Sequence, residues 1–104
     1  MSVKIVLLNT GENIICDAKE IVSDESVYAY LLVKPHKVVL ERPVFLTENM
    51  EEDNDTVSVT LSPWIPLTKD EKILVSLNSV VTLVEPIESI KEMYMEKVGE
   101  STDD

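Results

Sequence analysis

Two side chains could form a nucleophile and its general base, and each of these residue types occurs once. Cys16 is the only cysteine and His36 the only histidine among the 104 residues, so a Cys/His pair would be the thiol-based catalytic arrangement open to this chain. Cys16 alternates with Ile14 and Ala18 on one face of a predicted strand, which is typical of a small buried side chain. His36 follows Pro35 in a predicted loop. We therefore expect no catalytic residue and no enzyme; an enzyme that uses Cys16 and His36 is the alternative.

The sequence contains no complete metal or cofactor motif. The run Asp53, Asn54 and Asp55 resembles the start of a calcium-binding EF-hand loop, but Ser58 and Trp64 stand where that loop has its glycine and its closing glutamate. One cysteine and one histidine cannot build a zinc site from soft ligands. Two glycines in all leave no dinucleotide-binding or P-loop motif. We expect no metal and no cofactor, with loose divalent-cation binding at the acidic run as the alternative.

Charge is distributed unevenly along the chain. The sequence carries 20 acidic and 9 basic residues, a formal net charge of −11. Residues 1–47 are close to neutral, and nearly all of the acidic excess lies in residues 48–104. This balance argues against a broad phosphate-binding face, because non-specific nucleic-acid affinity comes mainly from clustered lysine and arginine.

A predicted C-terminal helix carries glutamate at every fourth position, which places these side chains along one face. The residues are Glu88, Glu92, Glu96 and Glu100. A charged outer face is usually solvated, and this is the interpretation we favour. The alternative is that Glu88, Glu92 and Glu96 dock a basic protein partner.

Alternating apolar and polar residues predict a mainly β fold. The pattern indicates a small, strongly bent antiparallel β-barrel or curled sheet, with one helix that starts near Pro86 and stops at Gly99. Residues 35–37 should bend or break the third strand. We expect a single domain at residues 1–98 and an acidic tail at 99–104. The expected strands cover residues 3–9, 13–21, 27–34, 38–46, 56–62, 73–77 and 80–84.

The chain also carries signals about its compartment. No apolar run approaches the roughly 18 residues that span a bilayer, and the N-terminal run lacks a signal-peptide cleavage site. A lone cysteine is typical of a reducing compartment. We expect a cytoplasmic protein without a membrane partner.

Two segments resemble Sm-like proteins, most closely the small Sm-like proteins of tailed phages of the cyanophage type. Residues 5–17 (IVLLNTGENIICD) are similar to the first hairpin of that family, and residues 73–84 (ILVSLNSVVTLV) to its second motif. Residues 62–67 (SPWIPL) also occur in this form in the phage type. The resemblance implies a strongly bent five-stranded barrel, a homo-oligomeric ring formed through edge strands and, for a phage protein, a bacterial host cytoplasm. The family's N-terminal helix is missing, because the first predicted strand starts at Val3.

The resemblance further implies a single-stranded RNA site at the turn of the second motif, where Asn78 and Ser79 stand. This turn lacks the Arg-Gly or Lys-His pair of the family, so Asn78 would hydrogen-bond a base edge, and Tyr28 or Tyr30 would stack on a base. The implied function is a ring-forming, RNA-associated binding module with altered site residues. The alternative is an acidic scaffold module that docks a basic protein and binds no nucleic acid.

Overall fold

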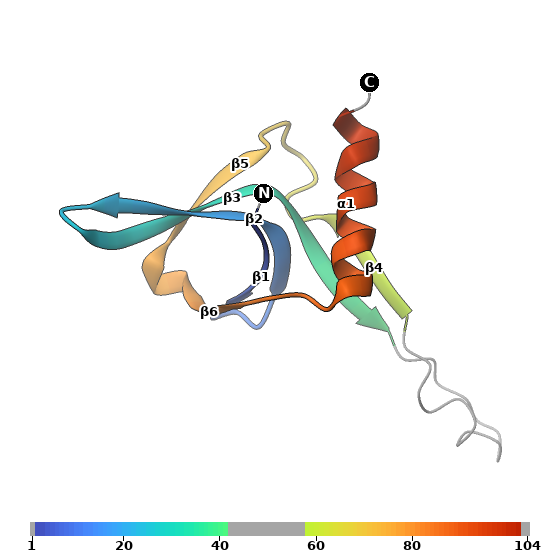
Figure 1. Ribbon diagram of the computed structural model, residues 1–104, viewed down its shortest axis with the longest axis horizontal. Coiled ribbons are helices and arrows are strands. Elements are labelled where there is room, and N and C mark those ends of the chain that lie inside the picture. Colours follow the sequence, from blue (N-terminus) through green and yellow to red (C-terminus); the bar gives the residue numbers. More distant parts are fainter. Residues whose placement is uncertain (1, 42–57, 103–104) are drawn as a thin grey trace, which may run out of the picture.

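The computed structural model describes residues 2–41 and 58–102, which form six strands, a short 3-10 turn and one α-helix (Figure 1). The prediction of a mainly β fold with a C-terminal helix is confirmed. The expected segments 42–46 and 48–55 lie outside the described residues. The elements are β1 (Val3–Leu8), β2 (Asn13–Ser23), β3 (Ser26–Glu41), β4 (Ser58–Pro63), β5 (Lys72–Ser76), η2 (Leu77–Ser79), β6 (Val80–Val84) and α1 (Glu88–Thr102).

All strands belong to one antiparallel sheet in the order β4-β3-β2-β1-β6, with β5 also paired to β3. The long strand β3 therefore pairs with β2 along one edge and with two strands along the other. Its first half pairs with β5, where Leu31 lies opposite Leu74, and its second half pairs with β4, where Val38 lies opposite Leu61.

The sheet curls but does not close into the barrel that the sequence predicted. Within residues 2–41 and 58–102, β5 pairs with β3 only and β6 with β1 only, so β5 and β6 leave the sheet open where a barrel would close. The inner face of the curl holds an apolar core. Its buried members are Val6, Leu8, Ile14, Cys16, Leu32 and Val75. The prediction that Cys16 is a core residue is confirmed.

The expectation that residues 35–37 bend or break the third strand is confirmed as a bend, because β3 continues through them. Ile15 pairs with His36 and Asp17 with Val33, so β3 carries one more residue than β2 across this stretch. Such a bulge bends a strand without ending its pairing. Lys34 adopts a φ of 53° at the bulge, a left-handed conformation that is uncommon for a residue other than glycine.

Backbone N–H and C=O groups at the bulge form hydrogen bonds with the segment between β4 and β5. The Lys34 amide donates to the carbonyl of Glu71 at 2.6 Å, and the Trp64 amide donates to the carbonyl of Pro35 at 3.2 Å. Because buried backbone groups need partners, these contacts allow β3 to turn sharply without losing hydrogen bonds. They also tie the segment between β4 and β5 to the middle of β3.

The helix α1 covers the outer face of the sheet over β1 to β4. Tyr94 and Val98 are buried there against Val3, Ile15 and Leu61. Apolar residues thus occupy both faces of β1 and β2, because one face lines the curl and the other supports α1.

The phenol of Tyr94 anchors α1 to the bulge of β3. Its hydroxyl oxygen lies 3.1 Å from the Val33 carbonyl oxygen and 3.0 Å from that of Lys34, and donates its hydrogen there. Burial, with the nearby Cys16 and Asp17, raises the pKa of Tyr94 above its ordinary value. A neutral phenol therefore holds the helix to the strand.

The expected helix stop at Gly99 is wrong, because α1 continues to Thr102. Glycine is unfavourable within a helix but does not by itself end one. The division into a domain at 1–98 and a tail at 99–104 remains a prediction. The one helix of the described residues is not long and apolar enough to cross a membrane.

Candidate functional site

The turn η2 holds the first two predicted site residues, Asn78 and Ser79, in a fixed backbone conformation. The Asn78 amide donates to the Ser76 hydroxyl at 3.1 Å. Asn9 donates twice to the turn, from its backbone amide to the Ser79 carbonyl at 2.8 Å and from its side chain to the Asn78 carbonyl at 3.2 Å. Asn78 itself is exposed. Its side-chain amide can therefore face a ligand while the backbone stays in place.

A cavity of about 300 Å³ opens beside η2 and includes Ser79. Half-buried Trp64 lines this cavity together with residues whose side chains carry hydroxyl and amide groups. A planar ring could stack on the indole and accept or donate hydrogen bonds with these groups. The lining residues are Leu8, Asn9, Thr10, Glu12, Trp64, Leu74, Val75, Ser76 and Ser79.

The electrostatics of this cavity do not favour phosphate. Among its lining residues Glu12 is the only charged one, and its carboxylate lies 3.6 Å from the Lys37 ammonium. Trp64 packs against the inner core and also lines the cavity that includes Ser79. The sequence alone did not indicate this site, because only the curl of the sheet brings these segments together.

The two predicted tyrosines occupy different surroundings. Tyr28 is 55% exposed and lies one residue before Ala29, which pairs with Ser76 of β5. Tyr30 is half-buried, packs against the inner core and lines a separate cavity of about 310 Å³. Neither tyrosine lines the cavity that includes Ser79.

The cavity at Tyr30 contains a lysine whose charge is already paired. Lys4 donates a hydrogen bond to Glu85, and this contact lowers the pKa of the Glu85 carboxyl. Glu20 lines the same cavity. An anionic ligand at Tyr30 would have to compete with these carboxylates.

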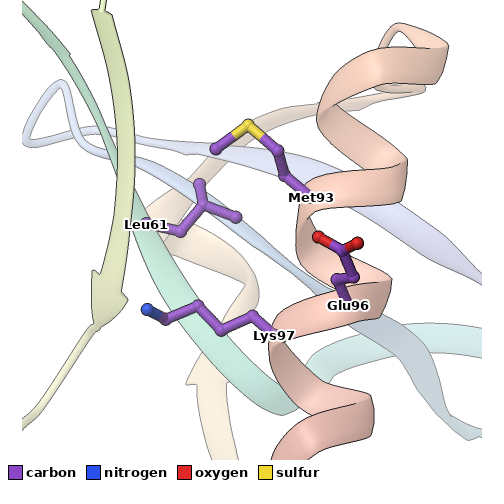
Figure 2. Close-up of a pocket in the computed structure, with 4 residues that line it drawn as sticks. All are labelled: Leu61, Met93, Glu96 and Lys97. Carbon is purple, nitrogen blue, oxygen red and sulfur yellow. The ribbon is translucent and has the colours of Figure 1, made fainter.

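Glu88, Glu92 and Glu96 are all exposed on α1, as the four-residue spacing predicted. No ion pair between described residues involves any of the three. Glu96 also lines a cavity of about 220 Å³ between α1 and β4, together with Leu61, Met93 and Lys97 (Figure 2).

Cys16 and His36 lie on opposite faces of the sheet. Cys16 is buried in the inner core, and burial, followed by the nearby Asp17, raises the pKa of its thiol to about 12. His36 lies in β3 rather than in the expected loop, and it pairs with Ile15, whose side chain belongs to the outer core. The imidazole packs edge-on against Tyr94 at 5.8 Å between ring centroids. This arrangement gives the thiol no adjacent base.

No described His, Cys, Asp or Glu residues form a group of three or more that could hold a metal ion. The acidic run at Asp53 to Asp55 lies outside the described residues, so loose cation binding there remains the alternative to the prediction of no metal.

The strands on either side of η2 expose apolar side chains at the open edges of the sheet. Leu74 on β5 is 62% exposed and Val81 on β6 is 61% exposed. Both strands also present an edge that pairs with no other described strand. Such edges invite pairing with another chain unless charge or proline blocks them.

The family of unknown function DUF6561 matches residues 1–99. No curated protein matches the chain.

Proposed function

The chain belongs to the DUF6561 family, whose function is unknown, and on that premise we propose that it is a self-assembling, Sm-like homo-oligomeric ring module. The β5 edge of one copy pairs with the β6 edge of the next copy. The observation that carries this proposal is the pair of unpaired, apolar edges on either side of η2.

The two edges suit head-to-tail assembly because they are different surfaces of one protomer. A contact between unlike surfaces repeats from copy to copy and closes when the rotation between copies completes a circle. Leu74 and Val81 would leave water at this contact, and each buried apolar side chain contributes about 1.5–3 kcal/mol at full burial. Lys72 is the only charged residue in either strand, and neither contains proline.

Native mass tests the assembly. We expect light scattering to find a multi-copy species for the wild type, and Leu74→Lys to lose the ring because it places a charge in the contact. Leu40→Lys is the matched control: Leu40 is 65% exposed, but on β3, so it should keep the wild-type mass. A wild type without a ring-sized species would contradict the proposal.

A ring would bring the η2 turns of all copies into one repeated arrangement, and we propose that single-stranded RNA binds there. Asn78 supplies an amide for base edges, and Trp64 and Tyr28 supply aromatic faces. The cavity that Ser79 and Trp64 line favours this assignment.

Binding of poly-U at low salt tests the RNA proposal. We expect fluorescence anisotropy to show binding whose affinity falls about tenfold for Asn78→Ala, the loss expected for about 1.4 kcal/mol. Ser89→Ala, on exposed α1, should bind as the wild type does. If the wild type does not bind poly-U at low salt, the RNA proposal is contradicted, whereas the ring proposal is not affected.

The alternative is that the acidic face of α1 docks a basic protein, and the exposure of Glu88, Glu92 and Glu96 favours it. An oligolysine peptide serves as the probe. Replacing all three residues by glutamine should abolish its binding. A variant with the same charge change at Asp24, Glu25 and Glu71 should retain it. Equal loss in both variants would indicate net charge rather than a docking face.

A further inference from the structure

The outer edge of β4 is unpaired in the part of the chain that the structure describes, because β4 pairs with β3 alone. The hydrogen bond from the Trp64 amide to the Pro35 carbonyl shows which residues of β4 direct their backbone groups toward β3. Since hydrogen-bonded pairs recur at every second residue, Ser62 and Thr60 point their backbone groups toward β3. The N–H and C=O groups of Val59 and Leu61 therefore point away from the sheet. No charged residue interrupts this edge, and its one proline, Pro63, stands at the end of the strand beyond Val59 and Leu61.

The flank of α1 forms a groove beside this edge. Figure 2 shows α1 running beside β4, with Met93 and Leu61 turned toward each other and Lys97 reaching toward β4. Leu61 is 6% exposed and Met93 is 36% exposed. Glu96 lies at the rim next to Lys97. The groove thus combines an apolar floor, an open strand edge and one charge of each sign.

We propose that this groove is a second self-association surface, at which the β4 edges of two copies pair antiparallel about a two-fold axis. The outward N–H and C=O groups of Val59 then hydrogen-bond with those of Leu61 of the partner subunit. The same groups of Leu61 hydrogen-bond with those of Val59 of the partner subunit. A two-fold axis between antiparallel strands is perpendicular to the sheet, so both α1 helices lie on the same face. Their flanks meet, and Glu96 faces Lys97 of the partner subunit twice.

The charges select a second copy as the occupant. A surface that carries both a positive and a negative charge can be complementary to itself across a two-fold axis. Glu96 then lies opposite Lys97 of the partner subunit, and Lys97 lies opposite Glu96 of the partner subunit. A basic peptide at this edge would meet Lys97, and an acidic peptide would meet Glu96, so either leaves one like-charge contact. The contact does not use the β5 or β6 edge, so it is independent of the ring and would join two rings where both form.

The test uses the Leu74→Lys protein, in which the ring contact is blocked. We expect a dimer by sedimentation equilibrium. Adding Glu96→Lys should raise the dimer dissociation constant about tenfold or more, because both ion pairs become like-charge pairs. Adding Lys97→Glu as well should restore the dimer. Glu92→Lys has the same charge change on α1 but does not line the groove, so it should leave the dissociation constant unchanged.

Val59→Pro removes an outward N–H and leaves the bonds to β3 in place, so it should also abolish the dimer while the far-ultraviolet circular dichroism stays unchanged. A monomeric Leu74→Lys protein, or a double charge swap that fails to restore the dimer, would overturn the proposal. The ring proposal has its own test. If the native mass of the wild type is no larger than that of the Leu74→Lys dimer, the ring is contradicted and the β4 contact is still supported.

Discussion

At the scale of single residues, the polar groups that matter most for the fold are buried and neutral. The Tyr94 hydroxyl serves two carbonyl groups at the bulge of β3, and the Cys16 thiol lies in the inner core. No buried side-chain nitrogen or oxygen among the described residues lacks a hydrogen-bond partner.

Tyr94→Phe should lower the free energy of unfolding by about 1–2 kcal/mol, because it removes the hydroxyl that donates to the Val33 and Lys34 carbonyls at the bulge. Urea unfolding measures this change. Tyr28→Phe is the matched control: Tyr28 is 55% exposed, so its change should stay within about 0.5 kcal/mol. Equal values for the two variants would show that the hydroxyl does not anchor α1.

Stability should fall at alkaline pH. Burial raises the pKa of the Cys16 thiol from its ordinary value of 9.0 to about 12 in the folded protein, so above pH 9 the unfolded chain releases a proton that the folded chain keeps. The free energy of unfolding then decreases with pH, by at most about 1.4 kcal/mol per pH unit for one group. The raised pKa of Tyr94 acts in the same direction at higher pH.

Cys16→Ala should flatten the decline between pH 9 and 10, as measured by urea unfolding at fixed ionic strength. The comparison is between slopes, since the smaller side chain also changes packing. An unchanged slope would mean that the thiol ionises equally in both states.

At the scale of elements, the sequence predicted strands well where one or both faces carried a regular apolar pattern. The residues of β1, β2, β5 and β6 were placed to within one or two positions, because burial on the inner core requires alternation. Pro35 predicted either a bend or a break in β3, and the structure shows the bend. What prevents the break comes from Glu71, Trp64 and Tyr94, which lie far away in sequence.

The hairpin between β2 and β3 offers a test of backbone strain. Asp24 and Glu25 form the two-residue turn between the paired Ser23 and Ser26, with φ angles of 53° and 68°. Glycine adopts such angles without steric cost. Glu25→Gly should therefore raise the free energy of unfolding by up to about 1 kcal/mol in urea unfolding. Glu20→Gly, within β2, should lower it by about 0.5–1 kcal/mol; the same sign for both would contradict the turn assignment.

At the scale of the whole molecule, the barrel was over-predicted and the cavity beside η2 was missed. Strand patterns specify which face is buried but not whether the last strand meets the first, and here β5 and β6 stay unpaired. Asn78 and Ser79 were chosen from their motif position. Trp64 and Ser79 line the same cavity because the sheet curls and because the Trp64 amide bonds to the Pro35 carbonyl. The spacing of residues in the sequence does not predict that these two segments lie together.

The open edges predict that thermal stability depends on protein concentration. If copies associate in the folded state only, mass action raises the melting temperature as concentration rises. We expect this for the wild type by differential scanning calorimetry over a hundredfold concentration range. A variant that combines Leu74→Lys with Glu96→Lys blocks both proposed contacts and should melt at one temperature throughout. Leu40→Lys combined with Glu92→Lys makes the same charge changes elsewhere and should keep the concentration dependence. A wild type whose melting temperature does not change would show that the exposed residues Leu74 and Val81 remain in water.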